Sequence, residues 1–139
     1  MHFYTTSEID RPFYGGLHHC GIIVRNATSS KSFYMEVFGF TDESHLRPAN
    51  LPYPGAFLCC GGATQIHLME LPDPDSDSVR PAYPGRDRHV ALRVDSVEKL
   101  SSRLAARAVP HQLSSSGRKA LFCRDPDGNG FEFVEMAWS

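Results

Sequence analysis

Short runs in which apolar and polar residues alternate recur along the chain, and they enclose segments with helical spacing. In residues 17–24, histidine, glycine and isoleucine share one side, and cysteine, isoleucine and valine share the other. A period of two predicts a strand with one buried face. The next segment begins at 26–29, contains Phe33, Tyr34 and Val37, and stops at Gly39, which predicts a helix.

The same pattern occurs twice. Residues 17–24 align with residues 87–94, 70 positions later, and each segment has a histidine directly before its alternating apolar residues. Residues 62–70 align with residues 127–135, 65 positions later, and each of these follows another apolar run. Self-similarity of this kind indicates two related structural units. We therefore expect two halves, each with a strand, a helix and two or three further antiparallel strands.

The helix of the second half is expected to begin at Asp95, because Glu98 follows at the spacing of a capping box. Leu100, Leu104 and Ala108 then form an apolar stripe along one helix face, and a proline two residues later ends the helix.

Four further runs predict the remaining strands. Apolar runs at 56–60 and 120–123 precede turn sequences rich in glycine, asparagine and aspartate, as in hairpins. The less regular runs at 41–46 and 111–115 are the candidates for the middle strands.

The length favours one domain built from both halves. A chain of 139 residues suits a single domain, whereas a half of about 60 residues is marginal alone. We expect one domain over 1–139, with half-modules 16–71 and 86–136 joined by a linker at 72–85 that contains four prolines and three aspartates. The predicted fold class is α+β, with mixed sheets curled around a concave face.

Composition and charge argue against several classes of protein. The net charge of −2, without a long basic run, argues against a nucleic-acid partner. No apolar run approaches the roughly 20 residues of a membrane span, and the N-terminus lacks the apolar region of a secretion signal. No C-x-x-C pair occurs, so we expect reduced, buried thiols and a cytoplasmic location. The cysteines are Cys20, Cys59, Cys60 and Cys123.

Strand alternation places four polar side chains on the faces opposite the helices. They occupy equivalent positions in the two halves, two in each. Imidazole and carboxylate groups are ligands of Zn, Ni, Mn or Fe, so the pattern predicts a divalent metal site. The predicted ligands are His19, His67, His89 and Glu132, with His18 as the alternative to His19.

Basic side chains near this face are candidates for binding an anionic substrate. Arg93 shares the face of His89, and Arg47, Arg118 and Lys119 lie in predicted loops. Solvated loop charge is the alternative interpretation of the loop residues. The remaining histidines, to which we assign no role, are His2, His45 and His111.

Five motifs together resemble the vicinal oxygen chelate superfamily, which includes glyoxalase I, bleomycin-resistance proteins, fosfomycin-resistance enzymes and extradiol dioxygenases. The resemblance implies paired βαβββ modules that form a cupped sheet around a metal, with ligands at His19, His89 and Glu132. His67 stands where glyoxalase I has a glutamate or glutamine. The motifs are LHHC at 17–20, SFYMEVFGF at 32–40, QIHL at 65–68, RHVALRV at 88–94 and RDPDGNGFE at 124–132.

The resemblance implies an enzyme that chelates vicinal oxygens of a small substrate and stabilises an enediolate, as in lactoylglutathione lyase. Glu132 or His67 would then be the catalytic base. One alternative is an Fe(II) extradiol-type dioxygenase that uses His19, His89 and Glu132, and another is a non-catalytic drug-binding resistance protein. We expect a homodimer, and members of the family build the site either within one chain or across two.

Overall fold

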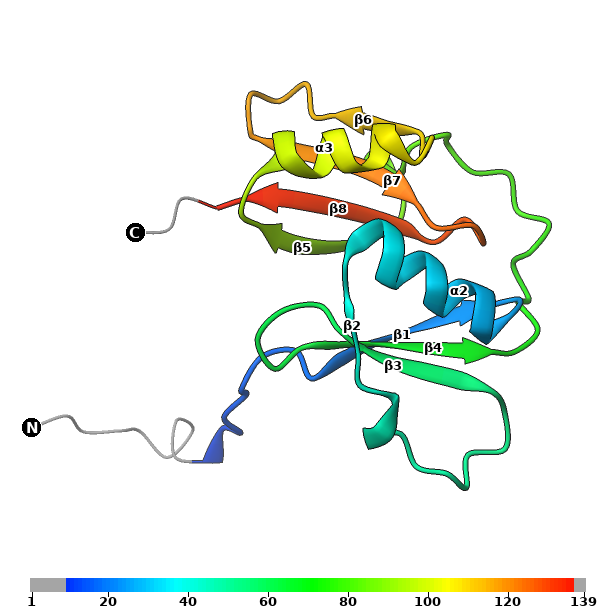
Figure 1. Ribbon diagram of the computed structural model, residues 1–139. Coiled ribbons are helices and arrows are strands. Elements are labelled where there is room, and N and C mark those ends of the chain that lie inside the picture. Colours follow the sequence, from blue (N-terminus) through cyan, green and yellow to red (C-terminus); the bar gives the residue numbers. More distant parts are fainter. Residues whose placement is uncertain (1–9, 137–139) are drawn as a thin grey trace, which may run out of the picture.

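The computed structural model describes residues 10–136, which form two four-stranded sheets with helices packed against them (Figure 1). The first half contains one helix, which continues as a π-helix, and a short 3-10 turn. Its elements are β1 (His19–Val24), α2 (Ala27–Phe33), the π-helix (Tyr34–Phe38), β2 (Thr41–Asp42), the 3-10 turn (Ser44–Leu46), β3 (Gly55–Cys59) and β4 (Gln65–Glu70).

The second half repeats this order after a linker that ends in a second 3-10 turn, Pro84–Arg86. Its elements are β5 (Val90–Val94), α3 (Val97–Ala106), β6 (His111–Leu113), β7 (Ala120–Arg124) and β8 (Gly130–Glu135).

The two sheets have equivalent topologies, β1-β4-β3-β2 and β5-β8-β7-β6. In each sheet the first and last strands of the half pair in parallel, and the other neighbours are antiparallel. The predicted α+β class with paired βαβββ modules is therefore confirmed.

One apolar core is shared by both halves. Alternate residues of β1, β3 and β4 face it from the first sheet, and Phe131 and Phe133 of β8 face it from the second. The ring of Phe38, from the π-helix of the first half, lies 5.3 Å from Phe131 and 5.1 Å from Phe133. Figure 1 accordingly shows α2 between the two sheets and α3 along the second sheet. The opposite face of each sheet is left outside this core.

A buried hydrogen bond joins the two halves across the core. The Tyr34 hydroxyl donates to Asp125 Oδ2 over 2.6 Å, and both side chains are buried. Burial raises the pKa of both groups, although hydrogen bonds from the side chains of Tyr34 and Asn129 partly oppose the effect at Asp125. Beside it, Asn129 Nδ2 donates to the Ile23 carbonyl over 3.0 Å. The turn before β8 is thus fastened to the first half.

Both helices begin in the same way. Asn26 and Ser96 are the N-caps, and each side chain accepts a hydrogen bond from the backbone N–H three residues later. A glutamate at the end of the last strand of each half accepts from the first helical N–H over 2.9 Å, Glu70 in the first half and Glu135 in the second. Because the carboxylates sit at the positive helix N-termini, they also favour the helix dipoles.

The second helix differs from its prediction at both ends. Ser96 is the N-cap instead of Asp95, because the Ser96 hydroxyl reaches Lys99 N–H while Asp95 Oδ1 accepts from the adjacent Ser96 N–H. The helix ends at Ala106. Ala108 has a φ of 54°, so it lies in the left-handed region beyond the helix.

Other predicted features are shorter or partly different. The middle strands contain two residues in β2 and three in β6, and the chain after β2 enters a 3-10 turn. All four cysteines are free, but only Cys123 is fully buried, whereas the other three are partly exposed. Within residues 10–136, no helix has the length and apolar character needed to cross a membrane.

Replacing Tyr34 with phenylalanine should lower the free energy of unfolding by about 1–3 kcal/mol, because Asp125 loses a donor in a buried position. Urea unfolding monitored by circular dichroism measures the change. Tyr14→Phe is the matched control, since Tyr14 is 80% exposed and should leave the midpoint unchanged. Equal midpoints for Tyr34→Phe and the wild type would contradict the role given to this bond.

Candidate functional site

Two of the predicted metal ligands, His67 and Glu132, project from strand faces opposite the shared core, and the other two lie at the start of β1 (His19) and directly before β5 (His89). In β4, His67 lies between the buried residues Ile66 and Leu68. In β8, Glu132 lies between Phe131 and Phe133, which face the core. The register is also equivalent in the two sheets: His67 is flanked by a glycine and a phenylalanine, and Glu132 by an alanine and a phenylalanine.

The first half brings His19 and His67 together. Their rings stack with centroids 3.8 Å apart, and the ring of Phe57 stacks on the other side of His67 at 3.5 Å. Burial lowers the pKa of His67 to about 4, and the neighbouring histidines contribute to the shift. The His67 ring is therefore neutral at pH 7, as a metal ligand must be.

A hydrogen-bond chain fixes the His67 ring. Gln65 Nε2 donates to Glu43 Oε1 over 2.9 Å, which leaves Gln65 Oε1 to accept from His67 Nε2 over 2.8 Å. Since the proton is then on Nε2, His67 Nδ1 is the nitrogen with a free lone pair.

His18 lies farther from His67 than His19 does. Its ring centroid is 6.5 Å from that of His67, and its Nδ1 is 2.8 Å from Nδ1 of His19. The geometry therefore favours His19 over His18 as the partner of His67.

The second half brings His89 and Glu132 together. His89 Nε2 lies 3.1 Å from Glu132 Oε1, and Arg118 Nη2 donates to the other carboxylate oxygen over 2.9 Å. The Glu132 side chain is only 8% exposed. On the far side of the ring, His89 Nδ1 donates to the Asp87 carbonyl over 2.8 Å, so Nε2 is the nitrogen that faces Glu132.

The structure brings the four predicted ligands together as two pairs, one on each sheet, and not as a group of four. Within residues 10–136, no three His, Cys, Asp or Glu side chains have the spacing of a metal site. The donors within each pair nevertheless fit a divalent metal. One pair offers imidazole nitrogen, and the other combines imidazole nitrogen with carboxylate oxygen.

The candidate substrate-binding arginines have different surroundings. Arg118 contacts Glu132 directly, and Arg93 is exposed on the same face of the sheet as His89. Arg47 donates to the Tyr53 carbonyl and lies 5.4 Å from the Tyr53 ring, so it is held within its own loop. Lys119 pairs with Glu135, the last residue of β8, whose carboxylate also accepts from the first N–H of α3.

The histidines without an assigned role lie apart from both pairs. His111 bonds to the Ser101 hydroxyl and the Val109 carbonyl, and His45 lies in the 3-10 turn after β2. His2 falls outside the described residues.

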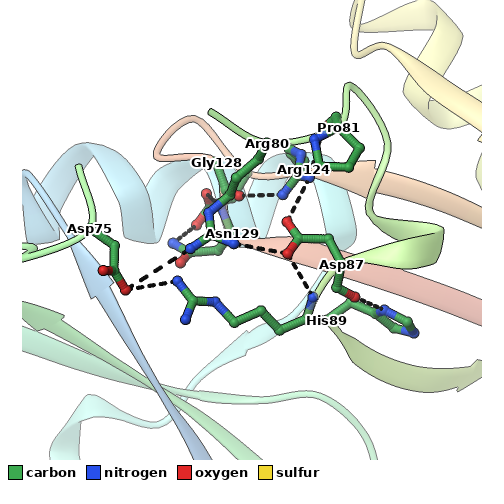
Figure 2. A network of polar contacts seen from close by, with 10 residues as sticks. Asp75, Arg80, Pro81, Asp87, His89, Arg124, Gly128 and Asn129 are labelled. Atoms are coloured by element: carbon green, nitrogen blue, oxygen red, sulfur yellow. Dashed lines mark hydrogen bonds and ion pairs between the residues drawn. The ribbon is translucent and has the colours of Figure 1, made fainter. Parts of the chain in front are cut away.

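A network around Asp87, shown in Figure 2, was not anticipated from the sequence. Its carboxylate accepts from Arg124 Nη2 over 3.0 Å and from Arg80 Nη1 over 2.8 Å. The hydrogen bond from Arg124 is the main cause that lowers the pKa of Asp87. The network lines an open cleft of about 1310 Å³ between the end of β1, the linker and the turn before β8. The only sequence signal was the position of Arg124 at the start of the RDPDGN motif.

The model of the Glyoxalase/Bleomycin resistance protein/Dioxygenase superfamily matches residues 16–133. The chain belongs to this superfamily. The resemblance inferred from the five motifs is therefore confirmed, and the match covers both halves of the chain.

The sequence identity to individual relatives is low. The chain is 31% identical over 117 residues to Glyoxylase I 4 of Arabidopsis thaliana, which covers 81% of this chain and 66% of that protein. Among solved structures, lactoylglutathione lyase from Agrobacterium tumefaciens has a TM-score of 0.60 at 22% identity, covering 88% of this chain and 94% of that one. A mutant of the fosfomycin resistance protein FosX from Listeria monocytogenes, complexed with Mn(II) and 1S,2S-dihydroxypropylphosphonic acid, has a TM-score of 0.67 at 19% identity, covering 91% and 95%.

Proposed function

We propose that this protein is a divalent-metal-dependent enzyme of the glyoxalase I type, which isomerises a small substrate with vicinal oxygens in the manner of lactoylglutathione lyase. The observation that carries the proposal is the pairing of ligand-type side chains at repeat-equivalent positions, His19 with His67 and His89 with Glu132. Chance placement would not be expected to produce a pair on the same outward face in both halves.

The proposed site is completed by a second copy of the chain. Each pair lies on a sheet face that points away from the shared core, so one chain carries two separate half-sites. In a symmetric dimer, the His19–His67 half of one protomer can face the His89–Glu132 half of its partner, and two equivalent sites result. This arrangement uses all four ligand-type residues without unpacking the core.

Glu132 is the proposed catalytic base. When bound, a divalent metal would supply Lewis-acid stabilisation of negative charge on the two oxygens of the substrate. Glu132 would remove the proton from the carbon next to the carbonyl group, and its low exposure keeps water from competing for the carboxylate. His67, held by Gln65, would assist proton transfer on the other side of the site.

One related structure supports the metal requirement, and a second supports the type of reaction. The FosX structure was solved with Mn(II) and a dihydroxypropylphosphonic acid, a ligand with vicinal oxygens, and the Agrobacterium tumefaciens relative is a lactoylglutathione lyase. The proposal extends this chemistry to the present chain through the donor pairs. The metal is expected to be Zn, Ni, Mn or Fe.

Purified protein loaded with Ni²⁺, Zn²⁺, Mn²⁺ or Fe²⁺ should bind one metal ion per chain. His89→Ala and Glu132→Ala should each lose the stoichiometric metal, because each removes a donor from the same pair. Elemental analysis after gel filtration measures the metal content. His111→Ala is the control and should keep it, since His111 bonds to Ser101 and Val109 outside the pairs. A wild type that takes up no divalent metal would overturn the proposal.

The metal-loaded enzyme should isomerise a hemithioacetal of methylglyoxal. The absorbance of the thioester product measures the rate. Glu132→Gln should lower kcat by at least about 100-fold, since a positioned base contributes roughly 10²–10⁴-fold. A metal-loaded protein that instead cleaves a catechol ring would establish the dioxygenase alternative. One that only binds drugs would establish the resistance-protein alternative.

The shared site can be tested with mixed dimers. One variant carries His19→Ala and His67→Ala, and the other carries His89→Ala and Glu132→Ala, each with a different affinity tag. Each variant alone should bind no metal. The doubly purified heterodimer should bind one metal ion, because one of its two sites receives an intact pair from each chain. A heterodimer without metal would place the complete site within a single chain.

A further inference from the structure

His89 occupies a position that the sheet does not fix. Strand β5 begins at Val90, so His89 lies just before the ladder, whereas His67 lies inside β4 and is paired on both sides. The ring of His89 is nevertheless oriented, because Nδ1 donates to the Asp87 carbonyl. The orientation of the ring therefore depends on what holds the backbone at Asp87.

Three donors hold the Asp87 carboxylate. Oδ1 accepts from Arg80 Nη1 over 2.8 Å and from the Arg88 backbone N–H over 2.9 Å, and Oδ2 accepts from Arg124 Nη2 over 3.0 Å. The Asp87 side chain is 12% exposed. Because donors reach both oxygens, the carboxylate and the peptide unit attached to it have little freedom to rotate.

Arg124 is held as firmly as its partner. Its Nη2 also donates to the Pro81 carbonyl over 2.7 Å, and its Nη1 donates to the Gly128 carbonyl over 2.8 Å (Figure 2). It therefore joins the linker, the turn before β8 and Asp87. Nη2 contacts both Asp87 and Pro81 while Nη1 contacts Gly128, a fixed planar arrangement of donors that a lysine could not reproduce.

We propose that Asp87 and Arg124 are positioning residues that hold His89 with its Nδ1 proton on the Asp87 carbonyl and its Nε2 toward Glu132. Neither residue bonds to Glu132, whose side-chain partners are His89 and Arg118. Their effect passes through the backbone of residue 87 to the ring. The consequence for metal affinity rests on the proposed function, whereas the orientation of the ring does not.

The first experiment uses metal-free protein labelled with ¹⁵N-histidine, with the His89 signals assigned by comparison with His89→Gln. At pH 8, the wild type should show a protonated His89 Nδ1. Asp87→Ala and Arg124→Ala should move the chemical shift of this nitrogen toward the unprotonated value. Asp87→Asn keeps a side-chain oxygen that can accept from an arginine, so it should retain most of the wild-type signal. An unchanged Nδ1 signal in both alanine variants would overturn the proposal.

Asp75→Ala is the matched control. It removes the pairing of Asp75 with Arg88 and Arg80 in the same network but leaves the bond between Arg124 and Asp87. The His89 signals should then stay as in the wild type. If Asp75→Ala shifts them as much as Asp87→Ala does, general loosening of the linker explains the effect and the proposal fails. Arg124→Lys provides a second variant if Arg124→Ala does not fold.

The second experiment measures Ni²⁺ affinity by calorimetry. Asp87→Ala and Arg124→Ala should weaken binding by about 10- to 100-fold, the range for groups that orient a ligand histidine, and Asp75→Ala should not. Unchanged affinity in the two alanine variants would overturn the metal consequence. If the wild type binds no metal, the proposed function fails, and the NMR experiment still decides whether Asp87 and Arg124 position His89.

Discussion

The arrangement of the molecule depends on the shared apolar core. Phe38 of the first half packs between Phe131 and Phe133 of the second, so the helix-covered faces of both sheets are directed toward each other. A half of about this size is only marginally stable alone, so the shared core stabilises both halves. Because the two halves use one face of each sheet to form the core, the other faces must point outward. The positions of the polar residues on those outer faces follow from this constraint.

On the outward face of the second sheet, the burial of the Glu132 carboxylate is electrostatically unfavourable. Its side chain is almost fully buried, and a buried carboxylate is unfavourable without compensating partners. Arg118 supplies a charged partner within the same half, over 2.9 Å. A divalent metal could replace part of this compensation, since it also carries positive charge. The pair of donors on the other sheet contains no carboxylate, and the nearest one described there, Glu43, is reached through Gln65.

Strand alternation made much of the fold and the side chains of the candidate site predictable, because it reports which strand face is buried. The repeat of 17–24 in 87–94 thus identified equivalent strands. The N-cap of α3 was missed because two adjacent residues both cap well, and only the local backbone decides between them. Alternation does not predict whether two outward faces meet within one chain. Their relative placement depends on long-range contacts such as that of Tyr34 with Asp125. Asp87 was missed because it acts through its backbone carbonyl, whose direction no residue pattern encodes.

The RDPDGN motif connects stability with the candidate site. Arg124 is the last residue of β7 and Asp125 follows it directly, and successive residues of an extended chain point to opposite sides. Asp125 therefore enters the core and bonds to Tyr34, while Arg124 reaches Asp87 beside His89. The asparagine at the other end of the same turn donates to a carbonyl of β1. This turn thus fastens the two halves and holds the backbone next to His89, a proposed ligand. A change in how the halves pack would therefore move His89 without any change in the residues that face the site.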